Sequence, residues 1–326
     1  MTGPDTGRPT GGLVTIGETM GLLRAVDFGP LRHARHLQLG VAGAESNVAI
    51  GVRRLGHAAS WIGRIGDDDM GDLVEATLRG EGVELFIDRD PGRPTGLMVK
   101  SQRTSSTTKV SYYRNGSAAS ALGPENLPLE VIASAAVLHV TGITAAISSS
   151  CMDAVEVAVE HARRNGTTVS FDVNHRSALW SDDVAGPVLK ALATNADIVF
   201  AGEEEASLVV GAPENSSAAD LATAIAELGP SEVIIKRGDR GALSLVDGSV
   251  IEEPGIAVTA VDPVGAGDAF VAGYLSAFLD GLGPVERLQT ANRTGAFAVT
   301  VSGDWEGAPT RRELALLGNG NGTVLR

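Results

Sequence analysis

Short apolar runs and longer helical stretches alternate along this chain. Residues 13–16 are an apolar run that predicts a strand, and residues 45–55 carry apolar side chains on one helical face, with Gly56 placed as a C-cap. Between them, residues 22–41 form an insertion of mixed pattern. Residues 95–113 alternate loosely, as strands at the edge of a sheet do. We expect these last two stretches to form a small second layer.

From residue 135 onward the alternation becomes regular. Apolar strands are predicted over residues 137–140, 169–173, 198–201 and 233–235, and helices over residues 148–164, 182–192 and 218–228. Strand–helix alternation of this kind predicts right-handed crossovers and a mostly parallel sheet that is covered by helices on both faces. Ligands of such sheets bind at the carboxyl ends of the strands.

The last part of the pattern predicts a strand over residues 257–261, followed by helices over residues 265–279 and 284–301. The two ends of the chain lack apolar periodicity. Residues 1–12 are rich in Gly, Pro and Thr, and residues 318–326 begin with Gly-Asn-Gly-Asn-Gly. We expect both ends to be disordered or flexible tails around one domain that spans residues 13–317.

Composition and charge exclude several classes of protein. The chain has 326 residues and a formal net charge of −14, which repels nucleic acid and anionic membranes. It contains no apolar run long enough to span a bilayer and no signal peptide, so we expect a cytoplasmic protein. With Cys151 as the only cysteine, an intramolecular disulfide and a cysteine-based zinc site are impossible. A polyphosphate ligand would arrive with a divalent cation.

The segment Asp262-Pro-Val-Gly-Ala-Gly-Asp-Ala-Phe270 carries the strongest chemical signal. It is a glycine-rich turn before an amphipathic helix, and the free N–H groups at such a helix start can bind developing negative charge. We predict that the N–H groups of Gly265, Ala266 and Gly267 hold a phosphoryl group while Asp268 accepts a proton from a substrate hydroxyl. A Gly-rich turn whose Asp merely favours the helix remains an alternative. A dinucleotide fingerprint and a Walker A loop both fail on spacing.

Two separated motifs resemble the signatures of the ribokinase-like (pfkB) carbohydrate kinases. The C-terminal one is Gly265-Ala-Gly-Asp268, and the N-terminal one comprises Gly43-Ala-Glu-Ser-Asn47-Val-Ala49, Gly56 and Gly63-Arg-Ile-Gly66-Asp-Asp68. The resemblance implies an α/β fold, a three-layer sandwich with a mostly parallel central sheet. It also implies a small β-sheet lid from about residues 20–42 and 95–113. The implied activity is ATP-dependent phosphorylation of a sugar hydroxyl.

Within this family, several stretches resemble 2-keto-3-deoxygluconate kinases. They are Tyr112-Tyr-Arg-Asn-Gly-Ser-Ala-Ala-Ser120, His139-Val-Thr-Gly-Ile143-Thr, Asp172-Val-Asn-His-Arg176 with Leu179-Trp180, Pro263-Val264, and Gly303-Asp-Trp-Glu-Gly307. The implied reaction converts 2-keto-3-deoxygluconate to its 6-phosphate. The resemblance assigns the substrate to Gly43, Asn47, Tyr112, Arg114, the Ile143 backbone, Arg176 and Asp304.

The two arginines of this set suit an acidic substrate. A guanidinium fork binds the carboxylate of a sugar acid better than it binds a neutral sugar. For Arg114 and Arg176 alike, a purely structural ion pair remains the alternative. Asp304 follows Gly303 and is as consistent with an ordinary turn residue as with a substrate contact.

The resemblance also predicts the nucleotide site. It assigns ATP to Gly202, to Lys236, Gly238 and Gly241 of one loop, and to Asn292, and it assigns Mg²⁺ to Glu205, although glutamates at a helix start are also favoured by the helix dipole. A plain Gly-containing hairpin is the alternative for the loop. Two positions depart from the family pattern: Gly202 replaces a usual Asn or Ser, and Met98 replaces a common Tyr.

Some questions stay open at this stage. The resemblance leaves a monovalent-cation requirement undecided, and a fructokinase or ribokinase remains possible within the family. A non-catalytic sugar or nucleotide sensor on the same fold is the alternative from another class, against which Asp268 argues because a sensor needs no base. Exposed lid strands are edges that often pair, so we expect a homo-oligomer that binds a small sugar or sugar acid.

Overall fold

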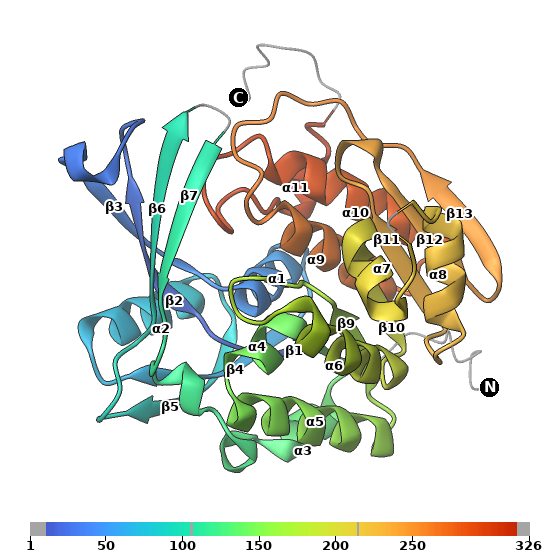
Figure 1. Cartoon of the computed structure of the whole chain (residues 1–326), viewed down its shortest axis with the longest axis horizontal. Helices are drawn as coiled ribbons and strands as arrows, with labels where there is room; N and C mark the ends of the chain where they lie inside the picture. The colour runs from blue at the N-terminus through green and yellow to red at the C-terminus, as the bar shows by residue number, and fades with distance from the viewer. Residues whose placement is uncertain (1–10, 105–106, 214, 318–326) are drawn as a thin grey trace, which may run out of the picture.

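Nine strands form the main sheet of this computed structural model, which describes residues 11–104, 107–213 and 215–317. The strand order is β13-β12-β11-β10-β9-β8-β1-β4-β5 (Figure 1). All neighbours from β11 to β5 run parallel, and β12 and β13 are antiparallel additions at one edge. The strands are β1 (Leu13–Ile16), β4 (Ala59–Gly66), β5 (Glu84–Asp90), β8 (Val137–Thr141), β9 (Thr168–Asp172), β10 (Ile198–Gly202), β11 (Glu232–Lys236), β12 (Ala242–Val246) and β13 (Ser249–Glu253).

Helices cover both faces of the main sheet because the side chains of its strands alternate between two apolar cores. Leu13 faces one core and Val14 the other, and Val137 and Leu138 divide in the same way. One core is closed by α3 (Leu129–Ser134), α4 (Gly142–Ile147), α5 (Ser149–Arg164), α6 (Asp182–Thr194), α7 (Glu203–Val210) and α8 (Ala218–Ala226). The other is closed by α1 (Ala44–Arg54), α2 (Asp69–Gly80), α9 (Ala266–Leu279) and α10 (Pro284–Ala298), with the short α11 (Arg311–Leu314) beside α10. This is the predicted three-layer α/β architecture.

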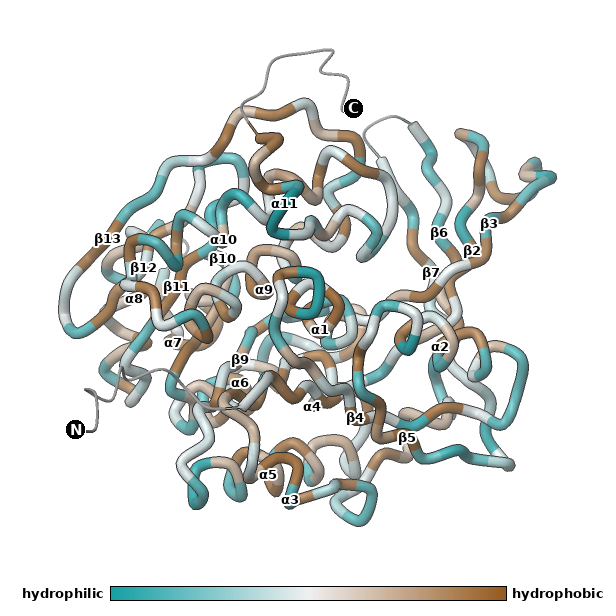
Figure 2. Tube along the Cα trace, turned by 180° about the vertical axis from the view of Figure 1, so that it is seen from behind, coloured by the Kyte–Doolittle hydropathy of each residue, from teal (hydrophilic) through white to brown (hydrophobic). Residues whose placement is uncertain are grey.

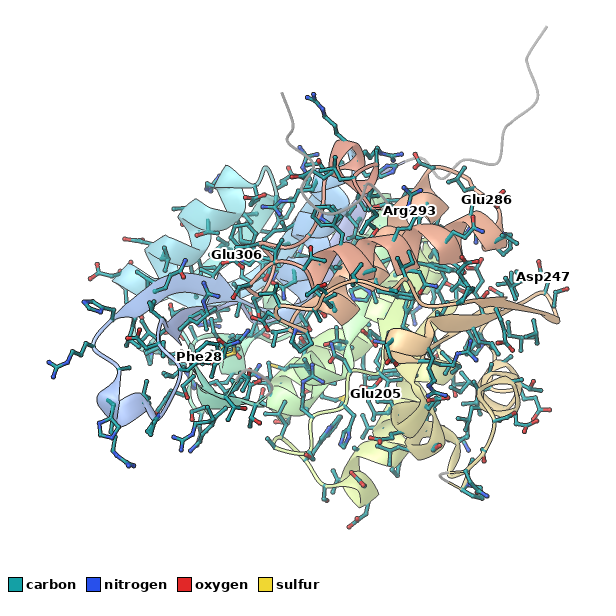
Figure 3. All side chains as sticks on the ribbon, turned by 90° about the horizontal axis from the view of Figure 1, so that it is seen from above. Phe28, Glu205, Asp247, Glu286, Arg293 and Glu306 are labelled. Atoms are coloured by element: carbon teal, nitrogen blue, oxygen red, sulfur yellow. The ribbon has the colours of Figure 1, made fainter. Side chains whose placement is uncertain are left out.

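A separate small sheet stands to one side of this sandwich (Figure 1). It has the order β3-β2-β6-β7 and consists of β2 (Met20–Ala25), β3 (Leu37–Ala42), β6 (Leu97–Thr104) and β7 (Thr107–Tyr113). Phe28, which follows β2, and Asp247, in the turn between β12 and β13, lie toward opposite ends of the molecule (Figure 3). Hydrophobic residues recur along the strands and helices, and hydrophilic residues occupy many of the outer loops, although the loop between β13 and α9 is largely hydrophobic (Figure 2).

Most predicted elements match the structure to within a few residues, but one strand does not exist. Residues 257–261 pair with no strand; instead, the N–H groups of Val261 and Asp262 donate to the carbonyl of Val299. Val261 is exposed, so its apolar side chain supports no buried strand. The helix predicted over residues 284–301 ends at Ala298. Gly56 has φ +95° and follows α1, as its predicted capping role requires.

The predicted tails fall mainly outside the described residues, which exclude 1–10 and 318–326. The carbonyl of Gly12 accepts hydrogen bonds from the N–H groups of Ala136 and Val137, so the ordered fold includes this residue. No helix in the described part of the chain has the length and apolarity needed to cross a membrane.

Helices α1 and α9 approach each other closely, and this contact sets which residues meet one turn earlier on the two helices. A Cβ atom built on Gly51 would lie 2.6 Å from the Cβ of Ala272. Four residues earlier on the two helices stand Asn47 and Asp268, which the same approach brings together. Phe270 and Tyr274 anchor α9 on the sheet by edge-to-face contacts with Phe200 of β10.

We predict that Gly51→Ala destabilises the protein and moves Asn47 away from Asp268, because the added methyl group has no space between the helices. Overpacking of this kind costs about 1–3 kcal/mol. Gly80→Ala is the matched control, since nothing lies within 4 Å of a Cβ at that helix position. Thermal unfolding should show a lower midpoint for Gly51→Ala alone, and equal midpoints for the two variants would contradict this account of the packing.

Candidate active site

A large cavity opens where the main sheet faces the small sheet. It has a volume of about 1740 Å³ and reaches the carboxyl ends of β9, β10 and β11, the start of α9, and residues of β2, β6 and β7. A site for one drug-sized ligand usually measures about 300–1,000 Å³. The cavity therefore has room for two ligands side by side.

The start of α9 forms one wall of the cavity. Gly265 has φ +76°, and a Cβ at this position would lie 1.7 Å from the carbonyl oxygen of Asp304, so only glycine fits this turn. Gly265, Gly267 and Asp268 line the cavity. Ala266 is not part of the lining, and its N–H group donates to the carbonyl of Pro263 at 3.3 Å. The turn therefore presents the helix start to the cavity through Gly265, Gly267 and Asp268, whereas the N–H group of Ala266, which was predicted to bind the phosphoryl group as well, is already engaged.

The amide of Asn47 connects two carboxylates at the base of the cavity. Its Nδ2 donates to Asp268 Oδ2 at 2.8 Å and to Asp304 Oδ2 at 3.2 Å. The Oδ1 atom of Asn47 is buried and has no hydrogen-bond partner within the described structure. The amide of Asn47 thus uses its donor on the two carboxylates and leaves its acceptor unpaired. Asp304, whose alternative was a plain turn residue, here faces the same amide as Asp268.

Burial raises the pKa of Asp268 to about 7, and the neighbouring carboxylates of Asp304 and Asp172 add to this rise. The hydrogen bond from Asn47 and the charge of Arg176 act in the opposite direction on the same pKa. Burial likewise raises the pKa of Asp304 to about 6, against the opposing effect of Asn47. A carboxyl group with a pKa near neutrality is well placed to accept and release a proton.

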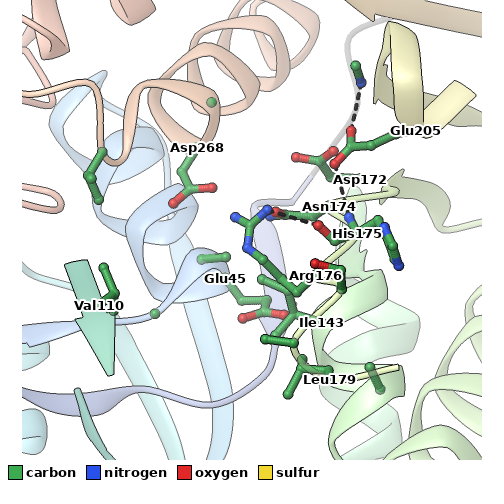
Figure 4. Close-up of a pocket in the computed structure, with 18 of the residues that line it drawn as sticks. Glu45, Val110, Ile143, Asp172, Asn174, His175, Arg176, Leu179, Glu205 and Asp268 are labelled. Carbon is green, nitrogen blue, oxygen red and sulfur yellow. Dashed lines mark hydrogen bonds between the residues drawn. The ribbon is translucent and has the colours of Figure 1, made fainter. Parts of the chain in front are cut away.

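The two predicted arginines have different surroundings. Arg114 forms an ion pair with Glu18, whose buried carboxylate lies 2.5 Å from the guanidinium, and it also stands over the ring of Tyr112 at 5.9 Å. Arg176 forms no ion pair with any carboxylate among the described residues; its guanidinium donates to the carbonyl of His175 at 3.2 Å. In Figure 4 it points into the space beside Asp268. Arg114 is thus ion-paired within the protein, whereas Arg176 lies near Asp268 without forming an ion pair among the described residues.

The remaining predicted substrate contacts also line the cavity, although the N–H group of Ile143 already has a partner within the protein. Gly43 stands at the start of α1, where a Cβ would lie 2.4 Å from the carbonyl oxygen of Glu18. The N–H group of Ile143 donates to Thr141 Oγ1 at 3.1 Å, so it is already engaged. Met98 is buried on β6 and packs with Met20, Leu22 and Ala42 in the apolar cluster of the small sheet.

Glu205 and Lys236 stand at the other end of the cavity. Lys236 Nζ lies 2.8 Å from both carboxylate oxygens of Asp172. Although burial by itself lowers the pKa of Lys236, Asp172 raises this pKa overall. Glu205 accepts hydrogen bonds from the N–H groups of Gly202 at 2.6 Å and His175 at 3.0 Å. Glu205 is the third residue of α7, and its carboxylate satisfies the N–H group of the N-cap residue Gly202.

Three residues of the predicted ATP site lie outside the described lining of the cavity: Gly238, Gly241 and Asn292. The loop that contains both glycines is the turn of the antiparallel hairpin β11–β12, so the hairpin alternative describes its geometry. Asn292 Nδ2 donates to the carbonyls of Glu253 and Pro254 at 3.2 and 3.3 Å. The loop reaches the cavity through Lys236 and Arg237, and the ATP contacts of these three residues stay predictions.

Sequence reasoning assigned no role to several polar residues of the cavity. Asp172 is the last residue of β9, and an acidic residue at the end of an otherwise apolar strand could have indicated its role. Asn174 follows with φ +40°, a strained conformation that is common at functional sites. Burial raises the pKa of Glu45, which accepts hydrogen bonds from the hydroxyls of Thr141 and Thr144, each at 2.6 Å. No sequence pattern indicates that the two threonines would meet Glu45.

The described residues contain no cluster of three or more His, Cys, Asp or Glu side chains that could hold a metal ion. Mg²⁺ in phosphoryl-transfer sites is often held by one or two carboxylates together with substrate phosphates and water. Asp172 and Glu205 both line the cavity, and each is already held, by Lys236 and by two backbone N–H groups respectively. Their remaining lone pairs fit a magnesium ion that is bound mainly through water and substrate phosphates.

Comparison with known proteins adds three findings. The chain is 38% identical over 306 residues to the 2-dehydro-3-deoxygluconokinase of Bacillus subtilis, a match that covers 93% of this chain and 94% of the relative. It is 35% identical to the 2-dehydro-3-deoxygalactonokinase of Haloferax volcanii, over 90% of this chain and 93% of the relative. Its fold is similar to a putative ribokinase II of E. coli in complex with ATP and Mg²⁺, with a TM-score of 0.87, 26% identity, and coverage of 94% and 98% of the two chains.

The family model described as the pfkB family carbohydrate kinase matches residues 11–311, which is nearly the whole chain. The match includes the start of α1 with Asn47, the turn at Gly265 and the carboxylate of Asp268, which meet in the cavity. The protein therefore belongs to the pfkB family of carbohydrate kinases.

Proposed function

We propose that this enzyme transfers a phosphoryl group from ATP to the terminal hydroxyl of a sugar acid, 2-keto-3-deoxygluconate. The observation that carries the proposal is the pair of Asp268, with a pKa of about 7, and Arg176, a cavity cation that forms no ion pair with a described carboxylate. Asp268 suits proton abstraction from a hydroxyl, and Arg176 suits an anionic substrate. The names of two relatives, a 2-dehydro-3-deoxygluconokinase and a 2-dehydro-3-deoxygalactonokinase, support the same substrate class.

In this proposal Asp268 accepts the hydroxyl proton as the C6 oxygen attacks the γ-phosphorus of ATP in line, and the bond from that phosphorus to the bridging oxygen breaks so that ADP leaves. The helix start that lines the cavity, at Gly265, Gly267 and Asp268, faces the transferring group, and its N–H groups stabilise the negative charge of that group. The amide of Asn47, which lines the cavity, holds Asp268 and Asp304 in place beside the sugar. When bound, Mg²⁺ neutralises the phosphates of ATP, and Asp172 and Glu205 are the carboxylates that would hold it, directly or through water.

The small sheet is proposed to act as a lid over the sugar, because Met98 and Val110 of this sheet line the same cavity as Asp268. Exclusion of water strengthens electrostatic interactions inside such a site. The homo-oligomer expected from the sequence stays a prediction, supported by the exposed apolar side chains of Phe28, Leu39 and Tyr113. The monovalent-cation requirement also stays undecided.

The direct experiment is a coupled assay of the enzyme with ATP and Mg²⁺ over a panel of sugars. The panel contains 2-keto-3-deoxygluconate, its galactonate epimer, fructose and ribose. We expect kcat/KM to be highest for one of the two acids, whereas a preference for fructose or ribose would contradict the proposed substrate class. Asp268→Asn is the matched negative control, because removal of a general base costs about 10²–10⁴-fold in rate.

We predict that Arg176→Ala lowers kcat/KM for the acid far more than for fructose. The variant loses a charge-assisted hydrogen bond worth about 1.5–3 kcal/mol, whereas Arg176→Lys keeps the charge and should lose less. Arg114→Ala should weaken the binding of both the acid and fructose and lower the unfolding temperature, because it leaves Glu18 buried without its partner. Equal losses for acid and neutral sugars in Arg176→Ala would show that this arginine does not bind the carboxylate.

We also predict an acid limb in the pH profile of kcat/KM with a midpoint near pH 7. Asp268 has a raised pKa of about 7, so it is protonated below this pH and cannot accept a proton there. In Asn47→Leu the hydrogen bond that stabilises the ionised form is lost, and the limb should move to higher pH. A bond of about 1.5–3 kcal/mol corresponds to roughly 1–2 pH units. A limb that stays at its wild-type position in Asn47→Leu would contradict the coupling of these residues.

A further inference from the structure

One buried ion pair joins the small sheet to the segment that starts α9. Lys100 lies in the middle of β6, and its Nζ is 2.7 Å from Oδ2 of Asp262. Both side chains are only 1% exposed. Lysine is almost never fully buried unless it is paired. The function proposed above gives no role to either residue.

Asp262 lies beneath the two backbone segments that complete the active site. Its Oδ1 accepts a hydrogen bond from the N–H group of Val264 at 3.2 Å, directly before the turn at Gly265. Its Oδ2 accepts one from the N–H group of Gly303 at 3.4 Å, directly before Asp304. The carboxylate of Asp262 therefore holds both the anion-binding turn and the loop of Asp304.

A second contact of the small sheet reaches the same loop. Arg24 of β2 donates a hydrogen bond from Nη1 to Ser302 Oγ, next to Gly303. Strand β2 is the parallel neighbour of β6, where Arg24 pairs in register with Lys100. Two cationic side chains from adjacent strands thus dock the small sheet onto the segments that carry Gly265 and Asp304.

The charge of Lys100 has a consequence for catalysis. An unpaired carboxylate beneath the turn would repel the negative charge that develops on the transferring phosphoryl group, and in a site shielded from water this repulsion is strong. A buried ion pair contributes little to stability compared with apolar packing, so stability alone gives little reason to retain it. We propose that Lys100 is a positioning residue for phosphoryl transfer: its ammonium group neutralises Asp262 and holds the turn before α9 and the loop of Asp304 in their active arrangement.

The test compares wild type with Lys100→Met, using the best acceptor found in the sugar panel, whichever sugar that is. The test therefore depends on the kinase activity of the family and not on the acid specificity proposed above. We expect kcat and kcat/KM to fall together by about tenfold or more with little change in KM, the pattern of an interaction made in the transition state. Where the methionine variant does not fold, Lys100→Gln serves instead, because it can still donate to Asp262 without a charge, and the same loss is expected.

Two further variants separate positioning from stability. Arg287→Met breaks a partly buried ion pair, with Glu232 at 2.5 Å, whose residues do not line the cavity. The unfolding temperature of this variant should fall while kcat stays within about twofold of wild type. Lys100→Met/Asp262→Asn removes both charges and should recover most of the lost kcat. Wild-type kcat in folded Lys100→Met or Lys100→Gln, or a double variant no more active than Lys100→Met, would overturn the proposal.

Discussion

The hydrogen bonds from Asn47 to two carboxylates are the interaction on which the active site depends. They join α1, α9 and the loop after α10, three segments that are far apart in the sequence. Their geometry is set by the contact of Gly51 with Ala272, where the absence of a side chain lets the two helices approach. Because one amide serves both Asp268 and Asp304, the protonation of the two carboxyl groups is linked. The packing of the two helices thus places Asn47 against both carboxylates and so affects their pKa values.

The charges around the cavity follow one rule: nearly every acidic group has a partner supplied by the protein. Glu18 has Arg114, Asp172 has Lys236, and Glu45 has two threonine hydroxyls. Within the described residues, the guanidinium of Arg176 has only a backbone carbonyl. A cavity in an acidic protein that keeps a guanidinium free of ion pairs among the described residues is suited to an anionic ligand. This arrangement connects the net charge of the chain with the proposed substrate class.

Sequence reasoning succeeded where local pattern and local structure agree. The strand over residues 13–16 and the helix start at Gly265 follow from apolar periodicity and from glycine at a turn, both of which act within a few residues. It was wrong about residues 257–261, whose apolar side chains lie at the surface, since burial depends on what the rest of the fold brings near them. The pairing of Arg114 with Glu18, and of Lys100 with Asp262, joins distant segments and leaves no local signal. For the same reason, the family motifs located Asn47 and Asp268 but not the pKa shift that results from their meeting.

The most direct test of this account is a titration of Asp268 itself in the free enzyme. Carbon-13 NMR of protein labelled at the aspartate carboxyl carbon, with the resonance assigned by its loss in Asp268→Asn, measures the pKa without any assay of activity. The account predicts a midpoint of about 7, far above the ordinary value of 3.8. A midpoint near that ordinary value would contradict the claim that the buried, Asn47-linked carboxylates create a base that works near neutral pH.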